Sequence, residues 1–260
     1  MAGSDLINLT VDSLIKSHYT TVFTGAGISV DSGIPAFRGE DGLWSTYDPA
    51  FLDIGNFYLN PQNSWTLIKQ IFYDHYEAAQ PNEAHVAIAQ LECWDIVKQV
   101  ITQNIDHLHQ RAGSKQIVEF HGTLSSLKCL SCGRSFSYNC SLLDKLPPRC
   151  KTCRGILKPD FVFFGEPIPA EASQNSLRAI ESTDVLIVIG TTGEVRPASE
   201  LPILAKNNGA TIIEINVKPS LFTDKITDIF LQDRATNVFK QIMQHIKYNY
   251  QFSTSSSKIG

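Results

Sequence analysis

Two closely spaced pairs of cysteines have the clearest chemistry in the sequence. The pairs are Cys129 with Cys132 and Cys150 with Cys153, and residues 133–149 separate them. Thiolates at this spacing are typical of a tetrahedral zinc site with no open coordination position, so the metal would be structural rather than catalytic. Four reduced cysteines without a metal are the alternative. The polar segment around them, however, has too small a hydrophobic core to fold without a cross-link or a bound metal. The sequence therefore predicts one structural zinc ion.

The chain has six cysteines. Disulfides are disfavoured in an intracellular protein, so clustered cysteines favour a metal site over a pair of bridges. Cys140 has no partner at ligand spacing, and Cys93, beside Trp94, is expected to be an ordinary buried thiol.

A glycine-rich turn is the second feature with chemical potential. Gly25, Ala26 and Gly27 follow a strand-like run and precede an expected helix. Backbone amides and a helix N-terminus at such a turn can hold the phosphates of a dinucleotide. Val30 stands where the full dinucleotide-binding pattern has its third glycine, and no acidic residue ends a second strand at the usual distance. A simple tight turn therefore stays open, and an ordinary dehydrogenase is not supported.

Alternating helices and strands must position these groups. Apolar runs at residues 20–24, 97–102, 117–120, 184–190 and 210–216 are typical of buried parallel strands. Helices are expected where apolar residues share one face. These are Ile7, Val11, Leu14 and Ile15; residues 199–208, closed by Gly209; and Ala235, Val238, Phe239, Ile242, Met243 and Ile246. The alternation predicts an α/β fold with a Rossmann-type, doubly wound parallel sheet.

Two segments interrupt the alternation. Residues 39–80 are rich in aromatic side chains and indicate a partly helical insertion, and residues 127–157 hold most of the cysteines. We predict that both form a smaller zinc-ribbon and helical domain. Residues 1–38, 81–126 and 158–252 would then form the Rossmann-type domain, and the serine-rich residues 253–260 a flexible tail.

Composition excludes several classes of function. The formal net charge is −4, which gives no basic face for nucleic acid. No apolar run approaches the roughly 20 residues of a membrane span, and the N-terminus lacks the features of a signal peptide. We therefore expect a cytoplasmic protein that binds neither nucleic acid nor a membrane. Its oligomeric state stays open.

Several motifs in order resemble the sirtuin family over nearly the whole chain. They are GAGISVDSGIPAFRG at 25–39, TQNIDHLHQRAG at 102–113, HG at 121–122, the cysteine pairs, KPDFVFFGE at 158–166, GTTGEV at 190–195 and IEIN at 213–216. The resemblance implies a Rossmann-type domain that binds NAD, a small zinc domain and a cleft between them. It also implies an NAD-dependent protein-lysine deacylase, most simply a deacetylase. Such an enzyme passes the acyl group to ADP-ribose and releases nicotinamide and free lysine.

The family motifs assign roles to matching residues of this chain. His121 matches the histidine that serves as base, a role suited to imidazole because it titrates near neutrality. Asn104 and Asp106 match the other catalytic positions. The cofactor-binding matches are Gly25, Ala26, Gly27, Phe37, Arg38, Gln103, Asn104, Ile105, Asp106, Gly190, Thr191, Thr192, Asn216 and Ala235. The substrate-binding matches are Val162, Phe163, Phe164, Gly165, Glu166, Glu194 and Val195.

Purely structural roles are the alternative for several of these residues. The amide and carboxylate of the QNID motif could simply cap a helix, Arg38 could be a surface residue and Asn216 a turn residue. His107 and His109 are expected to be surface or packing residues, and His18, His75, His85 and His245 have no motif support.

Two other functions share these motifs. A protein ADP-ribosyltransferase would use the same cleavage of NAD, and a non-catalytic NAD sensor would bind without turnover. The presence of Asn104, Asp106 and His121 favours deacylation.

The acyl group is expected to be neutral. The sirtuins that prefer acidic acyl groups carry a Tyr-x-x-Arg pair in the insertion, and this chain has no arginine between Arg38 and Arg111. Ala36 is one small residue shared with that branch. Tyr73 and Tyr76 are the nearest phenols, and Lys69 is the cation that could replace the arginine.

Overall fold

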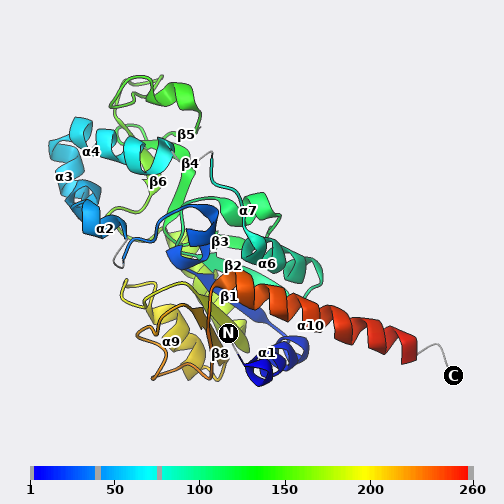
Figure 1. The fold of residues 1–260 in the computed structure, drawn as a ribbon. Helices are drawn as coiled ribbons and strands as arrows, with labels where there is room; N and C mark the ends of the chain where they lie inside the picture. The colour runs from blue at the N-terminus through cyan, green and yellow to red at the C-terminus, as the bar shows by residue number, and fades with distance from the viewer. Residues whose placement is uncertain (1–2, 39–41, 75–77, 257–260) are drawn as a thin grey trace.

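A six-stranded parallel sheet forms the centre of the larger part of the molecule (Figure 1). The computed structural model describes residues 3–38, 42–74 and 78–256. The strands lie in the order β3-β2-β1-β7-β8-β9. Their bounds are β1 Thr20–Thr24, β2 Val97–Thr102, β3 Ile117–Glu119, β7 Val185–Ile189, β8 Thr211–Asn216 and β9 Ile229–Gln232. Counted within this sheet, the order is 3-2-1-4-5-6, that of doubly wound dinucleotide-binding folds. The predicted fold class is confirmed.

The two central strands, β1 and β7, are buried on both faces because helices cover both. Every residue of β1 and β7 is buried, and the two strands pair in parallel from Thr20 opposite Val185 to Thr24 opposite Ile189. Continuous apolar runs of this kind are typical of parallel strands. The five strands expected from the sequence are present within one residue at each end, whereas β9 was not predicted.

One face of the sheet is covered by helices near the two ends of the chain and by α6. The helices are α1 Ser4–Lys16, α6 Glu83–Cys93 and α10 Ala235–Ser256. Buried residues of all three join strands β1, β2, β7, β8 and β9 in one core. The apolar stripe predicted on α10 is confirmed. On α1 the prediction is wrong for Ile15, which is 46% exposed, because it lies one residue beyond Leu14 and faces solvent.

The opposite face is covered by α8 Ala170–Ser182 and α9 Glu200–Asn207 (Figure 1). The helix expected at residues 199–208 is α9, whereas α8 was not predicted. Among the described residues, none of the helices combines the length and the apolar character that a membrane crossing requires.

Residues 253–256, the first residues of the predicted flexible tail, continue α10, and residues 257–260 lie outside the described part of the chain. The flexibility of the tail stays a prediction. A helix of this length follows from the regular apolar stripe of its first turns, which anchors it against the sheet.

The two interrupting segments lie together on one side of the sheet (Figure 1). The first contains short helices: α2 Leu43–Thr46, η2 Pro49–Leu52, α3 Ile54–Leu59, α4 Pro61–Ile68 and the π-helical turn η3 Lys69–Tyr73. The second contributes to a small antiparallel sheet in the order β5-β4-β6, with the helical turn η4. Their bounds are β4 Gly122–Cys129, β5 Ser135–Ser137, η4 Cys140–Leu143 and β6 Leu157–Phe161.

A shared core joins these segments. Trp65, Phe57 and Leu143 belong to one buried cluster that also contains Cys129 and Cys150. The Trp65 ring is fully buried, and its indole nitrogen donates to the carbonyl of Leu157 at 2.8 Å. Segments far apart in the sequence therefore depend on each other for burial, although the exact domain bounds proposed from the sequence stay a prediction.

Candidate active site

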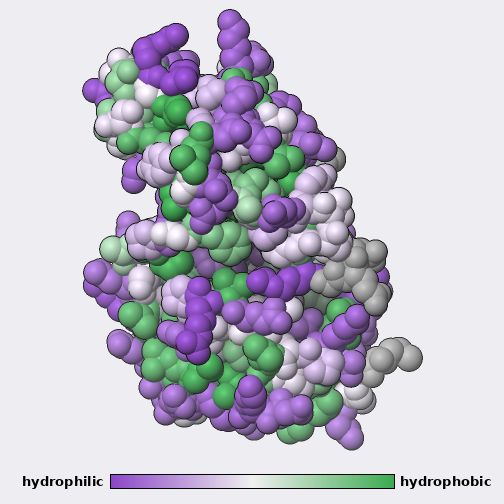
Figure 2. Space-filling model, turned by 90° about the vertical axis from the view of Figure 1, so that its left-hand side faces the viewer, coloured by the Kyte–Doolittle hydropathy of each residue, from purple (hydrophilic) through white to green (hydrophobic). Residues whose placement is uncertain are grey.

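A cavity of about 550 Å³ lies between the carboxyl ends of the parallel strands and the small sheet with its helices. Figure 2 shows the surface hollowed between the upper and lower lobes. The strand order reverses between β1 and β7, and clefts at such a reversal are where doubly wound folds bind ligands. The volume is that of a typical ligand pocket.

Most of the predicted site residues line this one cavity. They are Gly25, Ala26, Gly27, Phe37, Arg38, Gln103, Asn104, Ile105, His121, Val162, Phe163, Phe164, Gly165, Glu166, Gly190, Thr191, Thr192, Val195, Asn216 and Ala235. Two predicted residues, Asp106 and Glu194, lie outside the lining. The side chain of Glu194 is at its rim, where it pairs with Arg38, whereas Asp106 is buried behind the wall.

The glycine-rich turn is held against the end of β7. The Gly25 amide donates to the Ile189 carbonyl and the Gly27 amide to the Gly190 carbonyl, both at 2.9 Å. A Cβ atom on Gly27 would lie 2.6 Å from the Cα atom of Gly190, and Gly190 itself has φ +60°. Glycine is therefore required at both positions by backbone packing alone. The turn leads into the 3₁₀ helix η1 Ala26–Ser32, whose first residues line the cavity.

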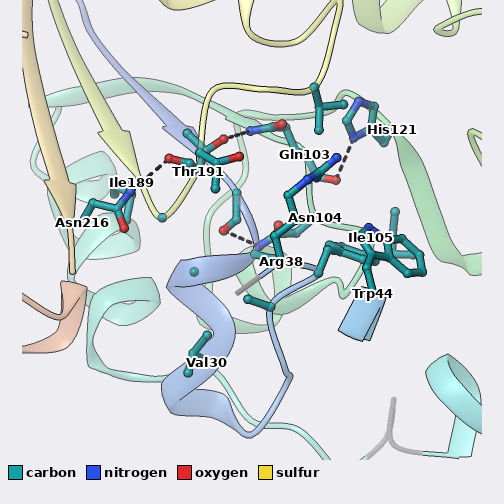
Figure 3. Close-up of a pocket in the computed structure, with 18 of the residues that line it drawn as sticks. Val30, Arg38, Trp44, Gln103, Asn104, Ile105, His121, Ile189, Thr191 and Asn216 are labelled. Carbon is teal, nitrogen blue, oxygen red and sulfur yellow. Dashed lines mark hydrogen bonds between the residues drawn. The ribbon is translucent and has the colours of Figure 1, made fainter. Parts of the chain in front are cut away.

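A chain of side chains links the ends of three strands across the cavity floor (Figure 3). Gln103 follows β2, Thr191 follows β7, and Asn216 ends β8. The Gln103 amide donates to the Thr191 hydroxyl at 3.2 Å, and the Asn216 amide donates to the Thr191 carbonyl at 3.0 Å. The floor is therefore neutral and polar, suited to hydroxyl and phosphate groups of a ligand.

A second polar chain runs from the cavity wall into the interior. Asn104 lines the cavity, and its amide donates to Ser29 Oγ and to the Gly25 carbonyl, both at 3.2 Å. Ser29 in turn donates to Asp106 Oδ2 at 2.7 Å. Asp106 also accepts from the Leu108 amide at 3.0 Å, so it closes the turn before α7 Leu108–Ala112. Burial raises the pKa of Asp106, while the hydrogen bonds from Leu108 and Ser29 oppose that rise.

This arrangement alters the expectation for Asp106. Its carboxylate contacts Ser29 rather than the cavity, so it acts on Asn104 through a hydroxyl. Ser29 is fully buried. It was not assigned a role from the sequence, although it lies inside the GAGISVDSGIPAFRG motif at residues 25–39.

His121 presents one free nitrogen to the cavity. Its Nδ1 atom lies 3.1 Å from the Gln103 carbonyl (Figure 3). A carbonyl oxygen only accepts, so Nδ1 carries the proton of the neutral ring and Nε2 is left as the base. Burial lowers the pKa of His121, and the hydrogen bond to Gln103 opposes this. The ring is therefore neutral at physiological pH and poised to take a proton.

The other described histidines have no such arrangement. His85 and His109 are buried, with ring centroids 4.9 Å apart. Burial lowers the pKa of His85 to about 4, and it lowers the pKa of His109 well below its ordinary range. His109 Nε2 lies 3.0 Å from the Thr24 hydroxyl. His85 and His109 therefore pack behind the glycine-rich turn.

Aromatic side chains form the wall opposite the strand ends. Phe37, Trp44 and Phe72 line the cavity with Phe161 and Phe163. Neighbouring rings are in contact, with centroids 5.3 Å apart for Phe37 and Trp44, and 5.7 Å for Phe72 and Phe161. Trp44, Leu52 and Phe72 were not predicted as site residues. The aromatic-rich composition of residues 39–80 was the available signal, but only the fold turns these rings toward the cavity.

Residues 162–166 form one edge of the cavity and end in a turn, where Gly165 has φ +87° and the Glu166 amide donates to the Phe163 carbonyl at 3.0 Å. The Val162 amide donates to the His121 carbonyl at 2.8 Å, and Phe164 exchanges hydrogen bonds with Leu52 and Ile54 at 2.9 and 3.0 Å. Within the described part of the chain, no hydrogen bond involves the Val162 carbonyl or the Gly165 amide. These groups leave an open edge to which an extended peptide could add.

Arg38 pairs across the cavity rim. Its Nε atom lies 2.9 Å from Glu194 Oε2, and both side chains are more than a third exposed. Such a pair contributes little to stability, so either residue is free to take a ligand instead. Further residues line the cavity that were not in the set of site residues assigned from the sequence. They include Asp31, Ile168, Arg196, Lys218, Asp233 and Arg234.

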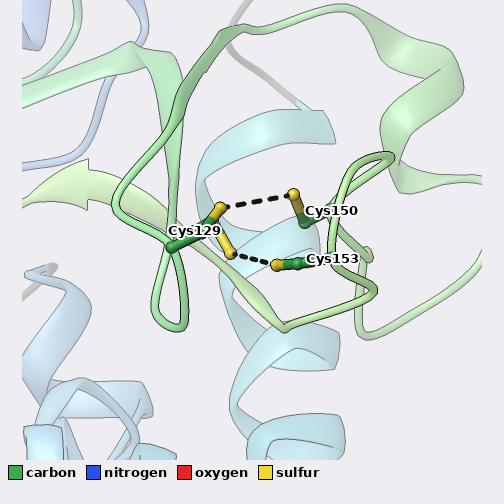
Figure 4. A group of neighbouring side chains, drawn as sticks. Cys129, Cys150 and Cys153 are labelled. Carbon is green, nitrogen blue, oxygen red and sulfur yellow. Dashed lines mark hydrogen bonds between the residues drawn. The ribbon is translucent and has the colours of Figure 1, made fainter.

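The four predicted zinc ligands converge in space. Their sulfur atoms all lie within 4.8 Å of one another (Figure 4). Two of the distances are 3.5 Å, between Cys129 and Cys153, and 3.8 Å, between Cys132 and Cys150. Zinc–sulfur bonds of about 2.3 Å in a tetrahedron place sulfurs roughly 3.8 Å apart, so the cluster has the size that zinc requires.

The other two cysteines lie outside this cluster. Cys140 is exposed at the start of η4. Cys93 is also exposed, so the expectation of a buried thiol is wrong. It ends α6 on the solvent side, because the buried residues of that helix, such as Leu91, take the opposite face.

Comparisons with known proteins agree on one family. The model of the Sir2 family matches residues 25–197. The NAD-dependent protein deacylase 2 of Pyrobaculum aerophilum is 43% identical over 240 residues, which cover 91% of this chain and 94% of that protein.

Solved structures agree in fold over the same extent. A Sir2 homologue in complex with NAD has a TM-score of 0.87 and 37% identity, covering 96% of this chain and 97% of that one. A Sir2 with deacetylated p53 peptide and 3′-O-acetyl-ADP-ribose has a TM-score of 0.87 and 33% identity, covering 92% and 98%.

Removal of the metal tests the cysteine cluster. We expect one zinc per chain by elemental analysis, and loss of that zinc with a lower melting temperature in Cys150→Ser. Cys150 lies in the core shared by the short helices and the small sheet, so loss of the metal should destabilise that core. Cys140→Ser is the matched control and should retain both metal and stability. A zinc-free wild-type protein, or a Cys150→Ser variant as stable as the wild type, would contradict the assignment.

Proposed function

Because this chain belongs to the Sir2 family, the sirtuins, we propose that it is an NAD-dependent protein-lysine deacylase. It transfers the acyl group of a modified lysine to ADP-ribose and releases nicotinamide. The observation that carries the proposal is the position of His121, whose free Nε2 faces a cavity shared by the glycine-rich turn and the aromatic wall. The relative from Pyrobaculum aerophilum is named an NAD-dependent protein deacylase.

NAD is the co-substrate, and the strand ends have the groups to hold it. We place its phosphates at the Ala26 amide and at Arg38, against the backbone of Gly27, and its adenosine ribose near Asn216. Asn104 is placed at the nicotinamide end, because its amide is fixed by Ser29 and Gly25. When bound, NAD would supply the electrophilic carbon of the reaction. The free Nε2 atom of His121 would take the proton of a ribose hydroxyl as that oxygen attacks the acyl carbon.

The acylated peptide is the second substrate. We place it as an added strand between residues 162–166 and 193–196, with its backbone bonded to the Val162 carbonyl and the Gly165 amide. The peptide complexes of related proteins support this class of substrate. The lysine side chain would pass between Phe163 and His121 toward the aromatic wall.

One experiment distinguishes this function from its rivals. Incubation with NAD and an acetyl-lysine peptide should release nicotinamide and lower the peptide mass by one acetyl group. An ADP-ribosyltransferase would instead raise the mass of an acceptor protein, and a sensor would bind NAD without releasing nicotinamide. A cytoplasmic location is proposed as well, since a reducing compartment keeps the four clustered cysteines available to a metal.

Substitution of the base is the first test of mechanism. We expect His121→Ala to keep the fold and NAD binding but to lower kcat by about 10²–10⁴, the usual contribution of a general base. His245→Ala is the matched control, because its Nδ1 also lies within hydrogen-bond distance of a backbone carbonyl, that of Gln241, at 2.9 Å, outside the cavity. Full turnover by purified His121→Ala would exclude the assignment.

The pH dependence tests the protonation state. Burial lowers the pKa of His121 from its ordinary value of 6.5, and only the neutral ring can accept a proton. Activity should therefore be constant at neutral pH and fall on acidification, with the inflection below 6.5. A profile of kcat/KM against pH measures it in the free enzyme. An acid limb centred above pH 7 would contradict this prediction.

The acyl preference tests the aromatic wall. We expect kcat/KM for acetyl-lysine to exceed that for succinyl-lysine by roughly 10², because a buried carboxylate without a cationic partner costs a few kcal/mol. Myristoyl-lysine should be accepted, since each buried methylene contributes about 0.8 kcal/mol. One peptide carrying each of the three groups gives the comparison.

Lys69 is the control for this preference. Its ammonium lies 2.5 Å from Asp74, and neither it nor Tyr73 lines the cavity. Tyr73 is buried and donates to the Leu124 carbonyl at 3.2 Å, whereas Tyr76 lies outside the described residues. Lys69→Met should therefore leave the acyl ranking unchanged. A succinyl preference that disappears in Lys69→Met would assign the acid-binding role to this lysine.

A further inference from the structure

A buried lysine lies beneath the edge proposed to bind the peptide. The side chain of Lys158, in β6, is only 8% exposed. Its ammonium donates to the carbonyls of Pro159 and Phe161 at 2.9 and 2.6 Å, and it lies 2.9 Å from Glu166 Oε2. It also lies 4.0 Å from the centre of the Phe163 ring. All three of its protons therefore have acceptors, and the fourth contact is a cation–π interaction.

These contacts make the chain fold around the ammonium. Residues 159–166 supply every acceptor as well as the aromatic face. Glu166 closes the loop, because its Oε2 atom also accepts from the Phe163 amide at 2.8 Å, while its own amide donates to the Phe163 carbonyl at 3.0 Å. One carboxylate oxygen thus joins the ammonium to the turn at Phe163.

The conformation of residues 159–166 also determines which of their backbone groups are available to a ligand. The amide of Val162 is used by His121, and both polar groups of Phe164 are used by Leu52 and Ile54. The Phe161 carbonyl accepts from the Lys158 ammonium, and the amide and carbonyl of Phe163 are both hydrogen-bonded to Glu166. Among the described residues, no hydrogen bond involves the Val162 carbonyl or the Gly165 amide, and both residues line the cavity, so they offer the pair that an added strand needs.

Lys158 itself is absent from the cavity lining, whereas Phe163 and Glu166 belong to it. Its effect on a ligand must therefore pass through these two residues. Without the ammonium, the Glu166 carboxylate and two carbonyls would lose their partner, and such buried groups are costly to leave unpaired. The segment would then rearrange toward solvent rather than keep its present shape.

We infer that Lys158 is a positioning residue for the acyl-peptide: its ammonium is the internal core around which residues 159–166 fold, and it holds the open edge in register for an added strand. The inference rests on the proposed deacylation, since the peptide is the substrate of that reaction. It assigns no contact between Lys158 and NAD, so the two substrates should respond differently to its loss.

The test separates peptide binding from NAD binding. In Lys158→Met we expect the peptide KM to rise roughly tenfold or more with the NAD KM within about twofold, the pattern of lost substrate binding. Lys158→Arg should restore much of the peptide KM, because a guanidinium can donate to the same oxygens and stack on Phe163. Anisotropy of a labelled acetyl-lysine peptide measures its binding without turnover.

Two further variants keep the test decisive. Lys206→Met removes another lysine ion pair, with Asp228 at 2.5 Å, outside the cavity lining, and should leave both KM values unchanged. Glu166→Gln weakens the same loop while it keeps an acceptor for Phe163, and it decides the outcome if Lys158→Met does not fold. Equal rises in both KM values, or an unchanged peptide KM in a folded variant, would overturn the inference. A wild-type protein without deacylation would instead refute the proposed function.

Discussion

The close approach of two backbone segments at the ends of β1 and β7 is the constraint on which the site depends. Gly27 and Gly190 lie so near each other that neither can carry a side chain without displacing the other. This contact places the Gly25–Gly27 turn directly above the point where the strand order reverses. The carboxyl ends of β2, β7 and β8 then meet at one edge, where the amides of Gln103 and Asn216 each donate a hydrogen bond to Thr191.

The two walls of the cavity differ in chemistry because they come from different parts of the fold. The parallel sheet contributes amides, hydroxyls and glycine backbone, which suit a nucleotide. The two interrupting segments contribute aromatic rings, which suit an apolar chain. His121 lies between them, with its Nδ1 fixed by the carbonyl of Gln103 on the polar side and its own carbonyl bonded to Val162 on the other. The base is therefore held by both walls at once.

Two buried ionisable residues hold the groups that face the cavity in position. Asp106 acts on Asn104 through Ser29, and Lys158 acts on the peptide edge through Glu166 and Phe163. Each ion is satisfied by several hydrogen bonds, as burial of a charge requires. This arrangement fixes the orientation of the groups that face the cavity.

The sequence by itself determined the fold class, the four metal ligands and most of the cavity residues. Buried parallel strands have continuous apolar runs, and cysteine pairs with ligand spacing are local patterns, so both are readable without a structure. The glycine turn, QNID and HG motifs are likewise local strings whose residues meet because parallel strands end at one edge. The α10 stripe was equally readable, since a helix that packs on a sheet repeats its apolar residues along one face.

Only the tertiary structure decided which long-range partners these residues have. Lys158 and Glu166 belong to one sequence motif, but they form an ion pair only because residues 159–166 fold back toward Lys158. The placement of Asp106 behind Ser29 and the turning of Phe72 and Trp44 into the cavity both depend on packing between distant segments. The exposure of Ile15 and Cys93 was misjudged for the same reason. Burial is a property of what packs against a residue, and that partner is not written in its local sequence.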